Sequence, residues 1–440
     1  MNHNFKSKRL LNLTISPYLW LLYSITLVNV YLLSGYFAYF FSVDSYEYVS
    51  LFRSAIGGFQ LFPILLVFVI ASFKLLGGKL KREELLFIFA ILYFAASAAR
   101  QGDLTSAIIT FRNLAAPLCF FWLGRIFAKS GFDTDVWYRG IVIISISLLF
   151  FAIVDILGGR YFWKNWFPTE FIASVKTAAI SSEGLMGNKT SGFQGVVLYR
   201  ISSSLFEPHH FGHLAVFFII LSLKIKSNLT KYALISLWIP FLFLSFVKAS
   251  YLFLASSLIA YHQRDRLKAL FQKGFFIRLV SITLLTSIYI LPVAGLSILF
   301  PATTIGAHIK SMGLIFFVDT PVEILFGSTL SSEYTSGGNT SENFSVLSSD
   351  SGFSSIVLPS GVVGVVFFLA SISLILKQLA ESNDNKLSAL GIPIIIGWLT
   401  IAPYVASGFS PMVSFLIFFT FGLHSCTKQP RGHQKNRFAK

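Results

Sequence analysis

Long apolar runs divide this chain of 440 residues, and short polar gaps or one of two longer polar stretches separate them. With 55% hydrophobic and only 12% charged residues, the chain has more apolar surface than a water-soluble core could bury. A hydrocarbon core about 30 Å thick takes about 20 apolar residues per helix, and backbone groups in lipid must be paired within the chain. Because the runs are continuous and do not alternate as barrel strands do, they predict an all-α polytopic membrane protein.

The runs predict about twelve transmembrane helices. Residues 232–262 form an almost unbroken apolar stretch, compatible with one long tilted helix or with two short helices that turn at Lys248. We favour two helices, because one helix would move the basic residues from Arg264 to Lys273 to the other side of the membrane. The predicted helices then cover residues 17–41, 57–76, 84–99, 105–128, 139–157, 208–225, 232–247, 249–262, 275–299, 354–376, 389–405 and 411–424.

The distribution of charge predicts the orientation of these helices. Alternate gaps and the two terminal segments hold 25 of the 35 Lys and Arg residues, whereas the other gaps hold 12 of the 19 acids. Lys and Arg near helix ends favour the cytoplasmic side of a membrane, so we expect both termini in the cytoplasm. The net charge of +16 then reflects topology and contact with anionic membrane lipids, and it does not indicate a nucleic-acid partner.

Residues 1–440 are expected to form a single integral membrane domain with two large extracytoplasmic loops, at residues 158–207 and 300–353. The cytoplasmic connections are too short for a nucleotide-binding unit, which needs a strand, a Gly-rich turn and a helix. Asp133 and Asp135 form an Asp-x-Asp pair like that with which nucleotide-sugar transferases hold a metal. The connection between the flanking helices is too short to build that fold, so we expect a solvated turn.

The second loop changes composition along its length. Residues 304–326 are apolar enough to lie at the membrane interface as a short helix that Asp319 and Pro321 end. Residues 327–355 are rich in Ser, Gly, Thr and Asn. This composition is typical of a flexible linker, and it is also compatible with a mobile lid over a long polar substrate.

Ionisable side chains at membrane depth are costly and often mark a functional site. Arg112 is predicted to lie about 12 Å below the outer end of its helix, at 1.5 Å rise per residue, where it either lines a site or extends to the outer headgroups. Lys248, at the tip of the apolar hairpin, is either a site residue or an interfacial anchor. Arg100, His308 and Lys310 add positive charge to the same outer side.

The densest polar cluster is RISSSLFEPHHFGH, residues 200–213, where the first long loop meets the next helix. Pro208 suits the first turn of that helix, and Ser203, Ser204 or Glu207 is expected to cap it. Arg200 and Glu207 would then be held by a rigid element at the mouth of the helical bundle.

Three histidines of this cluster, His209, His210 and His213, raise the question of a metal site, since residues 209 and 213 share a helix face. A zinc-like spacing with a further acidic or Cys ligand is missing from the sequence. We therefore expect these histidines to form hydrogen bonds or to face sugars, and we expect no metal and no cofactor.

Cations at the outer leaflet with one nearby carboxylate suit an anionic, lipid-linked substrate. A diphosphate leaving group gains charge as its bond to a sugar breaks, so cations already in place stabilise the transition state more than the ground state. The attacking hydroxyl is a poor nucleophile, so a carboxylate or an imidazole must take its proton. A single displacement with one base inverts the anomeric centre.

In these residues the chain resembles the O-antigen and capsular repeat-unit polymerases, the Wzy-type family. The similarity covers the plan of the whole chain through loose motifs, and it implies a GT-C-like membrane fold. The segment YRISSSLFEPHHFGHLAVFFI resembles the family's Arg, Phe-x-x-Pro and Gly after the large outer loop, and FLSFVKASYLFLASSLIAY resembles its Leu-Ser-x-Ser-Arg hairpin. The matching positions are Arg200, Phe206, Glu207, Pro208 and Gly212, then Lys248 where Arg is usual, and in the second outer loop and next helix Gly327, Asp350, Ser351, Gly352, Gly361 and Gly364.

The resemblance implies that the substrate is an undecaprenyl-diphosphate-linked oligosaccharide, with a chain-length regulator and a flippase as possible protein partners. It implies a bacterial cytoplasmic (inner) membrane with the site facing the exterior. Glu207 would be the base, with a histidine as the other candidate. The implied substrate-binding residues are Arg200, Lys248, Arg112, His209, His210, His308, Lys310 and Arg100.

Two other functions remain open at this point. An O-antigen ligase or a similar oligosaccharyl transferase would use a His in the second outer loop, for which His308 is the candidate. A flippase for the lipid-linked repeat belongs to a different class, and it would need charges along a path through both leaflets. The intramembrane charges of this chain gather near the outer face, which favours a polymerase.

Overall fold

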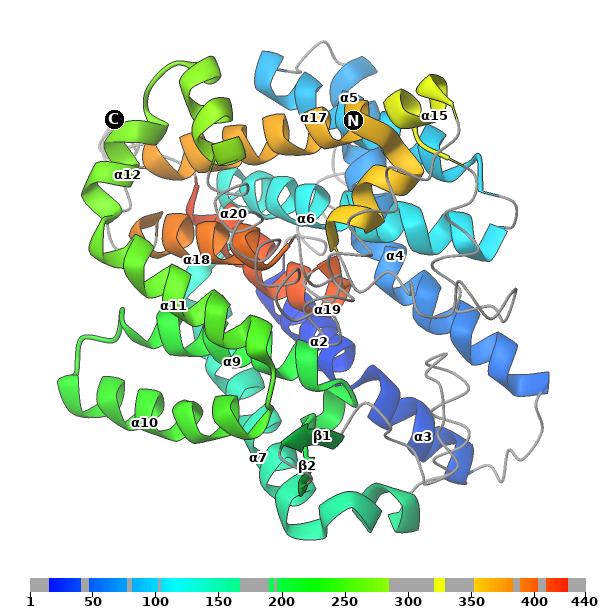
Figure 1. Cartoon of the computed structure of the whole chain (residues 1–440), viewed down its shortest axis with the longest axis vertical. Coiled ribbons are helices and arrows are strands. Elements are labelled where there is room, and N and C mark those ends of the chain that lie inside the picture. The colour runs from blue at the N-terminus through cyan, green and yellow to red at the C-terminus, as the bar shows by residue number, and fades with distance from the viewer. Residues whose placement is uncertain are drawn as a thin grey trace, which may run out of the picture.

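The computed structural model describes residues 16–40, 47–76, 81–101, 104–166, 190–193, 196–284, 320–328, 352–382, 388–402 and 409–425. Within these ranges the chain is helical apart from one short hairpin (Figure 1). The first helices are α2 (Pro17–Val28), α3 (Val30–Phe40), α4 (Glu47–Leu76), α5 (Arg82–Ala98), α6 (Leu104–Lys129) and α7 (Thr134–Trp166). Then follow the antiparallel strands β1 (Thr190–Phe193) and β2 (Val196–Tyr199), the 3-10 turn Ser203–Leu205, α9 (Pro208–Ser222), α10 (Asn228–Leu244), α11 (Lys248–His262) and α12 (Arg264–Phe271). The last elements are an apolar helix at Phe275–Leu284, α15 (Pro321–Phe326), α17 (Gly352–Ala380), α18 (Ser388–Ile401), α19 (Pro411–Ser414), a π-helical turn (Phe415–Phe419) and α20 (Thr420–His424).

The helices identify an all-α membrane protein. Four of them, within α4, α6, α7 and α17, are long and apolar enough to cross a membrane, and the bent pair α2 and α3 would make a fifth span. Large apolar side chains such as Phe73 and Leu157 are 72% and 82% exposed, which suits a surface that faces lipid. The two short helices predicted within residues 232–262 are confirmed as α10 and α11, with Lys248 as the first residue of α11.

Two predicted helices are not straight. The expected helix at residues 17–41 is bent by 71° between α2 and α3, where the Asn29 side chain donates to the carbonyl of Ile25. Inside α17, Gly361 adopts φ 62° and ψ −168°, which breaks the helix expected at residues 354–376. A Cβ at Gly361 would lie 2.4 Å from the backbone of Leu325, so a close approach by another segment explains the kink.

Helical structure continues into the segment predicted as the first long loop, although the apolar span of α7 ends at Gly158. Helix α7 continues to Trp166, beyond the predicted end at residue 157, and the hairpin of β1 and β2 lies just before the segment that leads into α9. The second loop differs as well, because Pro321 begins α15 and does not end a helix. Thr320 caps α15 by accepting from the amide of Glu323 at 3.3 Å, and Pro321 follows in the first turn.

Helix α6 packs backbone to backbone against the C-terminal helix α20. A Cβ at Gly124 would lie 2.3 Å from the carbonyl oxygen of Phe419, and one at Gly422 would lie 2.2 Å from that of Phe121. Small residues allow this approach in membrane proteins, where packing and close contact drive helix association. Stacked rings of Trp20, Phe415 and Phe419 surround the contact.

We expect Gly422→Ala to lower the free energy of unfolding by about 1–3 kcal/mol, because the added methyl group meets a backbone oxygen that cannot move aside. Thermal unfolding of the purified protein in detergent measures this change. The matched control is Gly58→Ala in α4, where a Cβ meets nothing within 4 Å. Equal stability of the two variants would contradict the close packing of α6 on α20.

Candidate functional site

A buried carboxylate holds the segment that precedes α9. Asp155, on α7, is fully buried, and its Oδ2 accepts from the amide of Ser202 at 2.8 Å and from that of Ser203 at 3.1 Å. The Ser203 hydroxyl donates to the carbonyl of Leu148 at 2.7 Å, and that of Ser204 donates to the carbonyl of Val28. These bonds fix a non-helical stretch of backbone against α7 and α2.

The turn after Ser202 presents Glu207 at the start of α9. Ser203 and Phe206 have positive φ values of 56° and 51°, and Phe206 is buried. Pro208 is the first residue of α9, as expected, and Glu207 occupies the N-cap position. The Glu207 side chain does not accept from the amides of the first turn, so the cap does not use its carboxylate.

Arg200 links this segment to the turn between α10 and α11. Its Nε donates to the carbonyl of Ser245 at 3.2 Å, and its guanidinium lies 3.3 Å from Nε2 of His209. Glu207 is close enough to interact electrostatically with it. Burial lowers the pKa of Arg200 from its ordinary value while Glu207 raises it, and a guanidinium stays charged in such a setting.

A glycine lets α9 pack against the same turn. A Cβ at Gly212 would lie 2.5 Å from Oγ of Ser250 and 3.0 Å from Oγ of Ser245. The buried His213 side chain pairs with Ser250 at 3.0 Å through Nδ1. Lys248 begins α11 three residues after Ser245 and is exposed, so it lies on the same turn as the carbonyl that Arg200 binds.

Tyr31, on α3, lies within electrostatic reach of both Arg112 and Glu207 of the Arg200–Glu207 cluster. The guanidinium of Arg112, on α6, donates to the side chain of Gln60 on α4 and is half-buried. Arg112 therefore contacts another helix of the bundle through Gln60.

Arg100 lies elsewhere, at the second long loop. Its guanidinium donates to the carbonyls of Phe326, Gly327 and Pro359, which ties the end of α15 to the kink of α17. In Figure 1 α15 lies at the top of the molecule, well apart from the hairpin of β1 and β2 that precedes Arg200. The structure thus gives Arg100 a positioning contact at some distance from Arg200 and Glu207.

The remaining predicted site residues are His210, His308 and Lys310. His210 is half-buried in the first turn of α9, next to His209. His308 and Lys310 lie outside the described residues. Among the residues that the structure describes, no three His, Cys, Asp or Glu side chains come together in a way that could hold a metal.

The pair at residues 133 and 135 forms the solvated turn that the sequence predicts. Asp133 is exposed, and its Oδ1 accepts from the amides of Asp135 at 3.0 Å and Val136 at 3.2 Å. This arrangement caps the start of α7. Sequence reasoning missed Asp155 and Tyr31, although an Asp within an apolar run was itself a signal.

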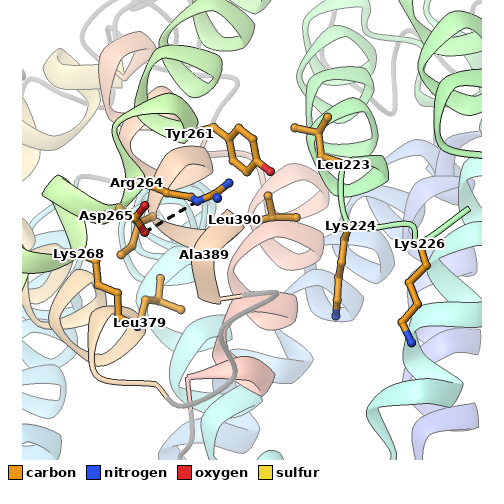
Figure 2. Close-up of a pocket in the computed structure, with 11 residues that line it drawn as sticks. Leu223, Lys224, Lys226, Tyr261, Arg264, Asp265, Lys268, Leu379, Ala389 and Leu390 are labelled. Carbon is orange, nitrogen blue, oxygen red and sulfur yellow. Dashed lines mark ion pairs between the residues drawn. The ribbon is translucent and has the colours of Figure 1, made fainter. Parts of the chain in front are cut away.

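A cavity of about 620 Å³ lies at the opposite end of α9 (Figure 2). It is therefore separate from the cluster at Arg200 and Glu207. The described residues of its lining include four cations, Lys224, Lys226, Arg264 and Lys268, and one carboxylate, Asp265.

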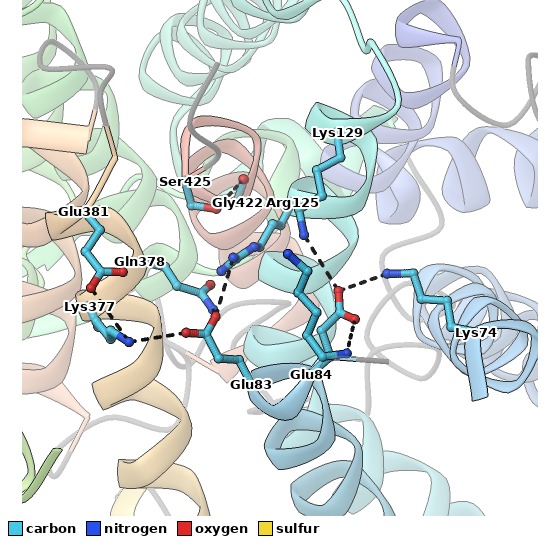
Figure 3. A network of polar contacts seen from close by, with 11 residues as sticks. Lys74, Glu83, Glu84, Arg125, Lys129, Lys377, Gln378, Glu381, Gly422 and Ser425 are labelled. Atoms are coloured by element: carbon cyan, nitrogen blue, oxygen red, sulfur yellow. Dashed lines mark hydrogen bonds and ion pairs between the residues drawn. The ribbon is translucent and has the colours of Figure 1, made fainter. Parts of the chain in front are cut away.

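A further charged cluster joins the ends of four helices (Figure 3). Two glutamates at the start of α5 bind cations from the ends of α4, α6 and α17. The ion pairs are Glu84 with Lys74 at 3.0 Å and Lys129 at 3.8 Å, and Glu83 with Arg125 at 3.6 Å and Lys377 at 3.3 Å. These contacts bring the start of α5 and the ends of α4, α6 and α17 to one side of the molecule.

The fold and the site define an all-α membrane protein with a cluster of Arg, Glu and His side chains at the start of α9. Comparison of the chain with protein-family models, with curated proteins and with solved structures found no match. The family resemblance of the sequence therefore stays a proposal.

We expect Asp155→Ala to destabilise the protein strongly, by about 1–3 kcal/mol for each of the two amides left without an acceptor. Asp155→Asn keeps one acceptor oxygen and should cost less. Thermal unfolding in detergent ranks the variants. If alanine were tolerated as well as asparagine, Asp155 would not anchor the segment before α9.

Proposed function

We propose that the protein is a nucleotide-independent glycosyltransferase that polymerises oligosaccharide repeat units carried on undecaprenyl diphosphate. The observation that carries the proposal is the contact of Arg200 with the turn that bears Lys248, together with the nearness of Glu207 and His209 to the same guanidinium. This arrangement offers two cations for a diphosphate and one carboxylate for a hydroxyl proton.

The proposed topology has twelve spans, both termini in the cytoplasm and the site at the outer face of a bacterial cytoplasmic membrane. Support comes from the ion-pair cluster, because all four helix ends that it joins are ones that the charge distribution assigns to the cytoplasm. The contact of Arg100 with Phe326 and Pro359 joins segments that the same distribution assigns to the outside.

In the proposed reaction a hydroxyl oxygen of the acceptor glycan attacks the anomeric carbon of the donor repeat unit. The bond from that carbon to the diphosphate breaks, and its electron pair leaves with the diphosphate. Arg200 and Lys248 stabilise the charge that develops there. Glu207 takes the hydroxyl proton, and a single displacement inverts the anomeric centre.

The remaining side chains have supporting roles in this proposal. Arg112 adds positive potential behind Tyr31, and His209 and His210 face the sugars next to Glu207. Arg100 holds α15 against α17 and so positions the second loop, to which His308 and Lys310 belong.

Glu207→Gln should reduce chain extension by about 10²–10⁴-fold, because an amide cannot accept the hydroxyl proton. The length of the polysaccharide made by cells that carry the variant as their only copy measures this effect. The control is Asp135→Asn, which removes an exposed carboxylate at the start of α7. Insertion of both variants into the membrane should match the wild type.

The products distinguish the three candidate functions. A polymerase variant leaves single repeat units attached to the acceptor, a ligase variant leaves polymer on the carrier lipid, and a flippase variant leaves repeats on the cytoplasmic side. Normal polymer from Glu207→Gln removes Glu207 from the mechanism.

Lys248→Ala should weaken binding of undecaprenyl diphosphate by about tenfold, the value of one charge-assisted hydrogen bond. Thermal stability should not change, because the side chain is exposed. Lys248→Arg should bind as well as the wild type or better, since a guanidinium makes a bidentate phosphate contact. Lys231→Ala, at the other end of the α10–α11 hairpin, is the control, and equal affinity of the two alanine variants rejects the role of Lys248.

A further inference from the structure

The cavity at the end of α9 is built by four separate parts of the chain. Lys224 and Lys226 follow α9, Arg264 and Lys268 belong to α12, and Leu379 and Leu390 come from α17 and α18. Figure 2 shows Lys224 and Lys226 extending side by side, with Arg264 and Lys268 across from them. The volume of the cavity, about 620 Å³, is in the range of small-molecule sites, roughly 300–1,000 Å³.

Leu379 relates the position of this cavity to that of the ion-pair cluster. The neighbouring residues Lys377 and Gln378 both bind Glu83, so the cavity lies on the side of the ion-pair cluster. The charge distribution of the sequence assigns that side to the cytoplasm, where the membrane surface is rich in anionic lipids.

The lining has an excess of positive charge. Among the described residues that line the cavity, Asp265 is the one carboxylate beside four cations. Its side chain is 94% exposed, and its Oδ1 lies 4.0 Å from Nε of Arg264. Cations held close together repel one another, and a bound anion relieves that repulsion.

Aromatic rings hold two of the cations in place. The Lys224 ammonium lies 4.6 Å from the ring centre of Tyr138, and the Arg264 guanidinium lies 4.8 Å from that of Tyr261. Tyr261 also lines the cavity and brings a hydroxyl donor to it. These two positive groups are thus positioned before a ligand arrives, which reduces the entropy cost of binding.

The rest of the wall is apolar. Leu223, Leu379, Leu390 and Ile392 line the cavity together with the cations. A ligand that matches both parts carries a negative head on an apolar body. Phosphate groups suit the head, because Lys and Arg bind them through charge-assisted hydrogen bonds.

We propose that this cavity binds the phosphate group of an anionic phospholipid, held by Lys224, Lys226, Arg264 and Lys268. The site is independent of the glycosyltransferase proposed above. A free phosphate has the same recognition chemistry, so the experiment distinguishes the two sources.

The test uses the full-length protein in lipid nanodiscs made of phosphatidylglycerol and phosphatidylcholine. Native mass spectrometry identifies the lipid that stays bound to the protein after the protein is released from the nanodisc. The wild type should retain phosphatidylglycerol in preference to phosphatidylcholine. Lys226→Gln combined with Lys268→Gln should reduce that preference about 25-fold, since each cation near an anionic membrane surface contributes about fivefold. The control combines Lys231→Gln with Arg266→Gln, which removes two cations that do not line the cavity.

A second measurement follows the melting temperature of detergent-purified protein against inorganic phosphate. One possible outcome is that phosphate raises the melting temperature of the wild type and the control but not that of the cavity variant, while no protein selects phosphatidylglycerol in nanodiscs. That outcome would identify free phosphate as the ligand and would support the site. The proposal fails if phosphatidylglycerol selectivity and the phosphate effect are both absent, or if the cavity variant and the control behave alike.

Discussion

One buried carboxylate satisfies the backbone where the chain leaves helical geometry inside the molecule. Between the hairpin and α9 the amides of Ser202 and Ser203 have no helical partner, and Asp155 accepts from both. Unpaired backbone groups are costly in a setting that excludes water, so non-helical backbone needs protein partners there. The positions of Arg200 and Glu207 depend on this anchored segment.

Close packing then brings side chains of that segment together with the turn between α10 and α11. Gly212 lets α9 approach the α10–α11 turn, and Arg200 binds the carbonyl of Ser245 in that turn. The second loop is held by a similar device, in which Arg100 donates to carbonyls at the kink of α17 around Gly361. In both places a guanidinium is bound to carbonyls of a helix break, where those groups lack helical partners.

Part of the fold and of the site could be predicted from the sequence. The break at Lys248, Pro208 as the first residue of α9 and the cluster of residues 200–213 follow from local rules of charge, capping and apolar length. The bend at Asn29 and the kink at Gly361 were not predicted, and the kink depends on the backbone of Leu325, which is distant in the sequence.

The sequence by itself determined that the chain is helical and belongs in a membrane, because apolar run length and charge placement act residue by residue. Only the tertiary structure decided that Asp155 holds the segment before α9, that Arg100 contacts the second loop, and that four cations line one cavity. These facts rest on contacts between residues far apart in the chain. Hydrogen-bond geometry and close packing select such contacts, and no local pattern of residues encodes them.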